Sequence, residues 1–301
     1  LLRLARGSGL DGLSGMAPIA PYPLGDFDGL RLARPLFGFP HDRLVATLVA
    51  RKQAWIADPS NDAERFARVQ IRNLAPALTD AGITRERIVG AAAHLRRARA
   101  AIDVAVATLI AEAVEVSPWG YALVAPERFA AAPAEVALRA LARIVEGVGG
   151  GTYPPRFEQT EAALAWAVAP NDRLRGRTLG GCRLARRADG RVLAVREEAA
   201  LVHDDPMAVL EPGDKVLWDG RFRLDLTKAP DTLEVRHLSA QGLKAAGKGV
   251  VLPQVEPHRI AITTPGLWRR GRLVAAPLLG FAADGVAVSA RFAGVGRGAP
   301  G

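Results

Sequence analysis

The spacing of apolar residues changes near residue 171, and this change constrains the fold more than any other feature of the chain. Before it, Ile88, Leu95, Ile102 and Leu109 recur every seven residues with alanines between them, which predicts a long amphipathic helix. After it, apolar and polar residues alternate, as they do over residues 222–226, which predicts half-buried strands. The sequence therefore indicates a helical middle part followed by a β-rich part.

The other predicted elements agree with this division. Pro133 and Pro154-Pro155 are each expected to open a further helix, so we predict a helical domain over residues 81–168. In the β-rich part, residues 169–301, Asp189-Gly190 separates two alternating runs and signals a hairpin. Further strands of a small, mostly antiparallel domain are predicted at 218–226, 232–238, 259–264 and 285–291.

The first 80 residues alternate between short extended and helical segments. A helix ending at Gly7, an extended piece at 29–36, a helix at 41–53 and the extended pair Trp55-Ile56 are expected in that order. This alternation is typical of the edge of a parallel α/β sheet. The predicted fold class is therefore α/β plus α+β.

Composition narrows the class of partner and of site. The chain carries 40 Lys and Arg against 31 Asp and Glu, a net charge of +9, which favours a polyanion such as a nucleic acid. Cys182 is the only cysteine, so an internal disulfide and a thiol zinc site are excluded, and the five scattered histidines suggest no metal site. No apolar run approaches the ~20 residues of a membrane span, so we expect no membrane partner and a cytoplasmic location.

A polar turn at Asp58-Pro59-Ser60-Asn61 ends an apolar segment and is expected to cap a new helix. On that helix, arginines recur at spacings of three and four and so share one face; they are Arg65, Arg68 and Arg72. Such a face suits an anion. An ordinary capped helix with a solvated basic side fits the same residues.

Two further basic features have open alternatives. Residues 171–196 hold eight Arg and two Asp, a net charge of +6, and alternating strands would place part of it on one RNA-binding face. Charges on exposed strands also protect sheet edges from pairing. The helix expected from Thr84 has a basic face that is either solvated or a rail for RNA phosphates.

Gly7-x-Gly9-x-x-Gly12 spells a dinucleotide-binding fingerprint, but the strand before it and the helix after it are not predicted. A glycine-rich loop beside Arg6 can still hold phosphate on its backbone amides. Met16 stands where a Gly-x-Ser-x-Gly nucleophile elbow needs its last glycine, so serine hydrolase chemistry is not supported.

The polar turn and the helix after it resemble a family signature. Asp58-Pro59-Ser60-Asn61, followed by Phe66, Arg68, Ile71-Arg72 and Pro76, is similar to the Asp-x-Ser-Asn … Arg-x-x-Ile-Arg … Pro pattern of the tRNA(Ile)-lysidine synthetases. The segments 6–16 and 34–36 are similar to that family in order and spacing. The resemblance is strong over residues 1 to about 80 and looser beyond.

The resemblance implies a PP-loop ATP pyrophosphatase-type ligase. Such an enzyme uses ATP, with Mg²⁺ accompanying it, to adenylate C2 of the wobble cytidine of an isoleucine tRNA with a CAU anticodon. The amine of L-lysine then displaces AMP to give lysidine. The implied partners are tRNA(Ile), L-lysine and, as the family resemblance allows, a second copy of the chain.

The resemblance also assigns residues to roles, with no catalytic residue identified. ATP or substrate would be bound by Arg6, Gly7, Ser8, Gly9, Asp58 and Asn61. By the resemblance, Arg68 and Arg72 would reach nucleotide or tRNA phosphate. The basic segment 171–196 adds four predicted tRNA-binding residues, Arg183, Arg186, Arg187 and Arg191. Residues 1–80 would be the C-terminal part of the PP-loop domain, 81–168 a tRNA-contacting helical domain and 169–301 a basic tRNA-binding domain.

The 301 residues lack the Ser-Gly-Gly-x-Asp-Ser loop that binds ATP in this family, and we expect it to lie upstream of Leu1. An incomplete chain of this kind is expected to be inactive alone. A non-catalytic tRNA-binding fragment is the alternative. A tRNA thiolase of the same superfamily is disfavoured, because one cysteine cannot supply a pair for sulfur handling.

Overall fold

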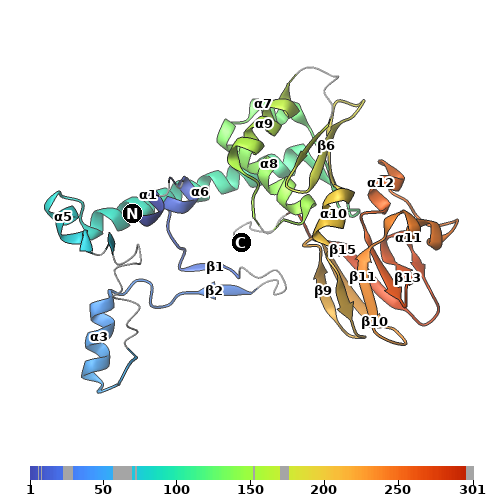
Figure 1. Ribbon diagram of the computed structural model, residues 1–301. Helices are drawn as coiled ribbons and strands as arrows, with labels where there is room; N and C mark the ends of the chain where they lie inside the picture. Colours follow the sequence, from blue (N-terminus) through green and yellow to red (C-terminus); the bar gives the residue numbers. More distant parts are fainter. Residues whose placement is uncertain are drawn as a thin grey trace. The chain divides into compact units, whose positions relative to one another are not determined.

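A computed structural model describes residues 1–5, 7, 9–22, 30–56, 70–71, 73–151, 153–169 and 176–295 (Figure 1). The chain divides into two compact units, and each is considered by itself. The first consists of residues 1–23 and 29–104, and the second contains residues 105–299. The division falls within helix α6 (Arg85–Ala113), the long helix that the seven-residue spacing predicts.

The first unit consists of short elements and the beginning of α6. Its helices and strands are α1 (Leu2–Ala5), α2 (Leu10–Leu13), β1 (Ile19–Pro21), β2 (Arg31–Ala33), α3 (His41–Ala50) and α5 (Ala75–Asp80). β1 and β2 pair antiparallel, with Ile19 opposite Ala33, so the parallel sheet expected in this part is not confirmed. Among the described residues of this unit, no hydrophobic side chain is fully buried.

The second unit begins with an antiparallel five-stranded sheet of order β3-β4-β7-β6-β5. Its strands are β3 (Val114–Val116), β4 (Tyr121–Val124), β5 (Arg177–Leu179), β6 (Cys182–Arg186) and β7 (Val192–Arg196). The predicted hairpin is confirmed, since β6 and β7 pair across Asp189-Gly190 and Gly190 has a φ of +82°. Leu123 pairs with Leu193, so this sheet crosses the expected boundary at 168/169, and residues 81–168 are not purely helical.

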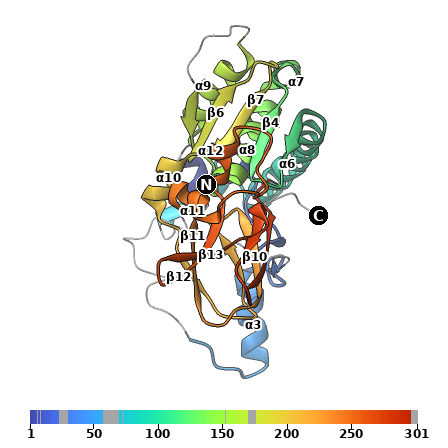
Figure 2. The same ribbon diagram turned by 90° about the vertical axis from the view of Figure 1, so that its right-hand side faces the viewer.

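Three helices accompany this sheet: α7 (Pro126–Ala131), α8 (Ala134–Gly149) and α9 (Phe157–Val168). α8 contacts β4, β6 and β7 (Figure 2). It buries Val136, Ala140, Ile144 and Val148, one residue per turn, which explains both its helical pattern and its attachment to the sheet. Gly150, with a φ of +71°, ends the helix in the left-handed conformation that glycine adopts most easily.

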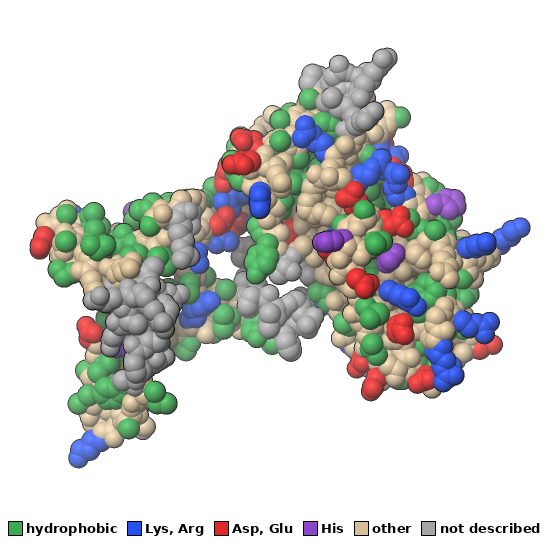
Figure 3. All heavy atoms as spheres, in the orientation of Figure 1, with side chains coloured by type: hydrophobic (Ala, Val, Ile, Leu, Met, Phe, Trp, Pro, Cys, Tyr) green, Lys and Arg blue, Asp and Glu red, His purple; other side chains and the backbone are tan. Residues whose placement is uncertain are grey.

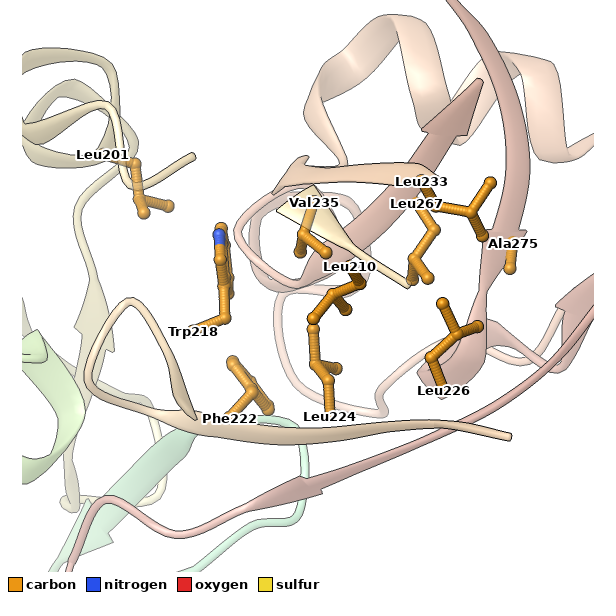
Figure 4. Close-up of a cluster of buried hydrophobic side chains, with 10 residues drawn as sticks. All are labelled: Leu201, Leu210, Trp218, Phe222, Leu224, Leu226, Leu233, Val235, Leu267 and Ala275. Carbon is orange, nitrogen blue, oxygen red and sulfur yellow. The ribbon is translucent and has the colours of Figure 1, made fainter. Parts of the chain in front are cut away.

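The rest of the second unit is a sandwich of two antiparallel sheets, ordered β15-β10-β9 and β14-β13-β12-β11-β8. The strands are β8 (Ala208–Leu210), β9 (Lys215–Trp218), β10 (Phe222–Lys228), β11 (Leu233–His237), β12 (Pro265–Arg269), β13 (Arg272–Ala276), β14 (Phe281–Ala282) and β15 (Ala287–Phe292). Phe222, Leu224 and Leu226 point from β10 into the core, as their alternation predicts (Figure 4). Val235 and Leu267 of the other sheet join them.

Short helices border the sandwich. They are α10 (Glu198–Asp204), α11 (Ser239–Ala246), α12 (Pro257–Ala261) and the 3-10 turn η2 (Pro277–Leu279). The strand predicted at 259–264 is wrong. Pro257 occupies the first turn of α12, and the strand β12 begins only at Pro265. Within the described residues, none of the helices combines the length and apolar character that a membrane span requires.

Candidate functional site

Gly7 and Gly9, the two described glycines of the loop after α1, leave their backbone accessible. Gly7 follows α1 with a φ of +69°, and its N–H donates to the carbonyl of Leu4 at 2.9 Å. Gly9 precedes α2 in an extended conformation. A Cβ atom placed on either glycine would meet no atom within 4 Å, so a phosphate group has room to approach this backbone.

Six of the predicted site residues lie outside the described residues. They are Arg6, Ser8, Asp58, Asn61, Arg68 and Arg72. The polar turn and the basic helix that follows it therefore remain predictions. The described residues that lead into that turn are exposed, with Ile56 at 95%.

The basic face of α6 is neither wholly solvated nor wholly free for RNA. Arg96 donates to the carbonyl of Met16 at 2.9 Å, and Arg99 contacts Asp11 at 2.9 Å. These two arginines therefore hold α2 and the segment after it against α6. Arg97, by contrast, is exposed.

Arg186 is the most firmly engaged of the four arginines predicted to bind tRNA on the β-rich side. Its Nη2 donates to the carbonyls of Trp166, Ala167 and Ala169 at 3.1, 3.1 and 2.8 Å. Its guanidinium also lies 5.8 Å from the centroid of the Trp166 ring. Arg186 thus satisfies carbonyls at the end of α9 and fastens that helix to β6.

The other three arginines pair with surface carboxylates. Arg183 contacts Glu256 at 3.2 Å. Arg191 contacts Asp189 at 2.9 Å and Glu115 at 2.8 Å, while Arg187 contacts Asp189 at 3.4 Å. The side chains of Arg183, Arg187 and Arg191 are each between 32% and 38% exposed. An RNA phosphate can therefore reach them, but it must compete with the carboxylates.

The pairing with arginines changes the pKa of Asp189, the carboxylate in the β6–β7 hairpin. Burial alone would raise the pKa of Asp189, but hydrogen bonds from the side chain and backbone of Arg191 and from Arg187 lower it overall. On the face of the molecule shown in Figure 3, basic and acidic side chains are likewise interspersed over the C-terminal strands. The six Arg and one Asp of the described residues 176–196 therefore do not form one uncompensated patch.

Sequence reasoning missed a buried ion cluster between the first sheet of the second unit and its sandwich. Arg196 of β7 donates to Asp219, in the β9–β10 turn, at 2.9 Å and to Asp204 of α10 at 2.7 Å. Arg221, fully buried, donates to Asp219 and to the carbonyl of Thr263. In the sequence, Asp219-Gly220-Arg221 has the pattern of a turn between two strands. The opposite charges at its two ends are the one feature that could have indicated an ion cluster.

Three glycine-containing turns meet beside this cluster. A Cβ atom on Gly149 would lie 2.1 Å from the carbonyl oxygen of Gly180, and one on Gly150 would lie 2.1 Å from that of Asp219. The turns border a cavity of about 520 Å³, which Tyr153 and Arg196 also line. Arg196 and Asp219 satisfy each other's hydrogen-bonding groups and charge. The cluster therefore acts as a structural clamp between the five-stranded sheet that contains β7 and the sandwich.

Cys182 lies next to these turns and is fully buried. Burial raises the pKa of its thiol to about 12, and its Sγ lies 3.3 Å from the carbonyl oxygen of Val145, to which it donates. A buried neutral thiol is a poor nucleophile. This environment agrees with the argument against a sulfur-transferring enzyme.

Comparison with known proteins finds a domain family for the first residues and named relatives for most of the chain. Residues 1–78 match a family described as PP-loop domain. The whole chain is similar to proteins named tRNA(Ile)-lysidine synthase: it is 36% identical to that of Ruegeria pomeroyi over 94% of this chain and 62% of the relative. It is 30% identical to that of Anaplasma marginale over 88% of this chain and 54% of the relative.

A third relative, the tRNA(Ile)-lysidine synthase of Methylobacterium nodulans, is 40% identical over 61% of this chain and 54% of its own length. The chain thus spans between 54% and 62% of the length of these curated relatives. The similarity extends well beyond the residues that match the PP-loop domain, so the helical and β-rich parts share the same relationship. By its sequence, the chain resembles the tRNA(Ile)-lysidine synthases along 94% of its length, and its first 78 residues match the PP-loop domain.

Proposed function

We propose that the chain takes part in the ATP-dependent ligation of L-lysine to C2 of the wobble cytidine of an isoleucine tRNA with a CAU anticodon, through an adenylated intermediate. The observation that carries this proposal is the similarity to a named synthase along 94% of the chain, together with the PP-loop match over residues 1–78. Because the relatives bear the name of an enzyme, the non-catalytic fragment is not favoured.

The first 80 residues would serve the nucleotide and the substrates. We assign ATP or substrate binding to Arg6, Gly7, Ser8, Gly9, Asp58 and Asn61. The open space beside Gly7 and Gly9 supports this assignment, since phosphate oxygens can accept hydrogen bonds from exposed backbone amides. ATP supplies the activating adenylyl group, Mg²⁺ would accompany its phosphates, and Arg6 would offset negative charge beside them.

The tRNA would be held by arginines outside the nucleotide loop. We assign phosphate contacts to Arg68 and Arg72 and, in the β-rich part, to Arg183, Arg187 and Arg191. Their partial exposure and their replaceable carboxylate partners support this assignment. Arg186 donates to three backbone carbonyls of α9 and the residue after it, so it would hold β6 in place and would not contact the RNA itself.

Each of the three predicted domains would have its own role. Residues 1–80 would belong to the synthetase domain, residues 81–168 would contact the tRNA, and residues 169–301 would add affinity for it. The enzyme would act on tRNA in the cytoplasm, alone or as a homodimer.

The proposal is tested by ATP-dependent incorporation of labelled lysine into a tRNA(Ile) transcript with a CAU anticodon. Two proteins are compared: the 301-residue chain, and a chimera in which the N-terminal part of the Ruegeria pomeroyi relative precedes residue 1. We expect incorporation by the chimera and none by the chain, whose sequence lacks the Ser-Gly-Gly-x-Asp-Ser loop. Changing the transcript's anticodon from CAU to GAU should abolish incorporation. A chimera that folds and binds this tRNA but transfers no lysine, while the intact relative does, would contradict the proposal.

A further inference from the structure

The helices α11 and α12 border the sandwich (Figure 1). Residues of both helices and of the segment between them line a groove of about 460 Å³. Four aliphatic residues, each half-buried, line it: Leu243, Val250, Leu252 and Ile262. Leu243 and Val250 also pack against the buried cluster of Leu238, Ala246, Ala276 and Leu279. The apolar floor is therefore fixed by the core and exists before any partner arrives.

The ionisable side chains around the groove are all basic residues. Lys244, His258 and Arg259 line it, and no acidic side chain does. Arg259 contacts Glu256 at 3.2 Å, and that carboxylate is shared with Arg183. In the part of the chain that the structure describes, the exposed side chains of Lys244 and His258 have no such partner. The groove thus offers an apolar floor beside unpaired basic groups.

The lining also discriminates between classes of occupant. Single-stranded RNA is bound largely through stacking of its bases on aromatic side chains, and no aromatic side chain lines this groove. Four aliphatic side chains instead suit the aliphatic anchor of a peptide laid into a groove. The basic rim complements carboxylates that flank such an anchor.

We propose that this groove is a docking site for an acidic peptide segment of a partner protein, with an aliphatic anchor set between its carboxylates. The anchor occupies the floor formed by Leu243, Val250, Leu252 and Ile262. The carboxylates contact Lys244 and His258. This inference is independent of the ligase activity, because it involves none of the residues assigned to ATP, lysine or tRNA.

The test uses three fluorescein-labelled peptides and fluorescence anisotropy on the full chain at fixed ionic strength. The probe is Glu-Asp-Leu-Leu-Asp-Glu. One control peptide, Lys-Lys-Leu-Leu-Lys-Lys, reverses the charge, and the other, Glu-Asp-Ser-Ser-Asp-Glu, lacks the anchor. We expect the probe to bind about tenfold more tightly than either control, because it alone has both an anchor and complementary charge.

Variants locate the binding. The double change Lys244→Glu and His258→Glu should remove most of the probe's advantage. Lys248→Glu, the same substitution as Lys244→Glu at an exposed lysine outside the lining, should leave it. Leu252→Asn should weaken the probe without altering the peptide that lacks an anchor. Equal binding of all three peptides, or an equal loss with Lys248→Glu, would overturn the proposal. So would a single-stranded RNA decamer that displaces the probe and itself loses affinity in the double variant.

Discussion

Arg196 and Asp219 form a buried ion pair with a distance of 2.9 Å, in which the two side chains are 3% and 5% exposed. One partner ends β7 of the first sheet, and the other stands in the turn between β9 and β10 of the sandwich. Arg221 shares the same carboxylate from the other side. The attachment between the two layers therefore depends on one aspartate that contacts two buried cations, while Asp204 supplies the second negative charge.

Asp219→Ala should destabilise the second unit by about 3–5 kcal/mol, because it leaves Arg196 and Arg221 buried without that carboxylate. Chemical denaturation followed by tryptophan fluorescence measures the loss. Asp231→Ala is the matched control, since it removes a partner of Arg269 in a half-exposed pair and should cost about 0–1 kcal/mol. Similar losses for the two variants would mean that the clamp does not stabilise the fold.

Replacing Arg183, Arg187 and Arg191 by Ser should flatten the salt dependence of tRNA binding. Each phosphate contact contributes a slope of about −0.7 when log affinity is plotted against log salt for single strands, so the triple variant should lose about 2 units of slope. Its circular dichroism spectrum should not change. A filter-binding titration from low to physiological salt measures the slope, and Lys215→Ser is the control for a general change in charge.

Arg186→Ser is expected to behave differently from those three. It leaves the carbonyls of Trp166, Ala167 and Ala169 without their donor, so it should lower the unfolding midpoint while changing the salt slope by less than one contact's share. An unchanged midpoint with a full loss of slope would instead identify Arg186 as a phosphate contact.

Gly150→Ala should be much more destabilising than Gly190→Ala. Both glycines have a φ near +70 to +80°, which costs a residue with a Cβ atom about 1–2 kcal/mol. At Gly190 no atom lies within 4 Å of the added Cβ, whereas at Gly150 the carbonyl oxygen of Asp219 lies 2.1 Å away. Thermal unfolding of the two variants separates backbone strain from steric clash, and equal shifts would show that the second turn can move aside.

Cys182 should make stability depend on alkaline pH. Its thiol has an ordinary pKa of 9.0, raised by burial to about 12 in the folded chain. The contribution is fully present below pH 9. Above it the unfolded chain loses this proton while the folded chain keeps it, so the free energy of unfolding falls by about 1.4 kcal/mol per pH unit until about pH 12.

Cys182→Ala isolates this effect. The variant loses packing at every pH but lacks the ionisable thiol. The gap in unfolding free energy between the two proteins should therefore narrow by about 1.4 kcal/mol for each pH unit above 9. Urea denaturation at pH 8, 9.5 and 10.5 measures that gap, and a constant gap would contradict burial of the neutral thiol.

Much of the fold could be predicted from sequence because local patterns match local structure. The alternation of Phe222, Leu224 and Leu226 predicts both β10 and its buried face, and Asp189-Gly190 predicts the hairpin. The strand predicted at residues 259–264 was wrong, although the sequence pattern there is that of a strand. Ile260 and Ala261 are consecutive and both fully buried. A strand with one solvated face cannot bury neighbours in this way, whereas a short helix pressed into a corner can.

The candidate site was less predictable, because composition shows how many arginines a segment has but not what they contact. The partners of Arg186 are backbone carbonyls at the end of α9, which leave no mark in the sequence. Arg196 counted toward the basic segment, yet it is among the most buried charges in the described chain. In both cases tertiary contacts decide the role.

The meeting of three glycine-containing turns has a consequence for how this chain can evolve. Gly149 and Gly220 are far apart in sequence, but a Cβ atom on either would meet the backbone of another turn, at the carbonyl oxygen of Gly180 or of Gly150. A side chain introduced at either glycine cannot be accommodated by a smaller side chain on the facing turn, because the atom it would meet belongs to the backbone. A side chain at Gly149 or Gly220 therefore requires the facing backbone to move, and that movement would displace the turn that carries Gly180 or the turn that carries Gly150.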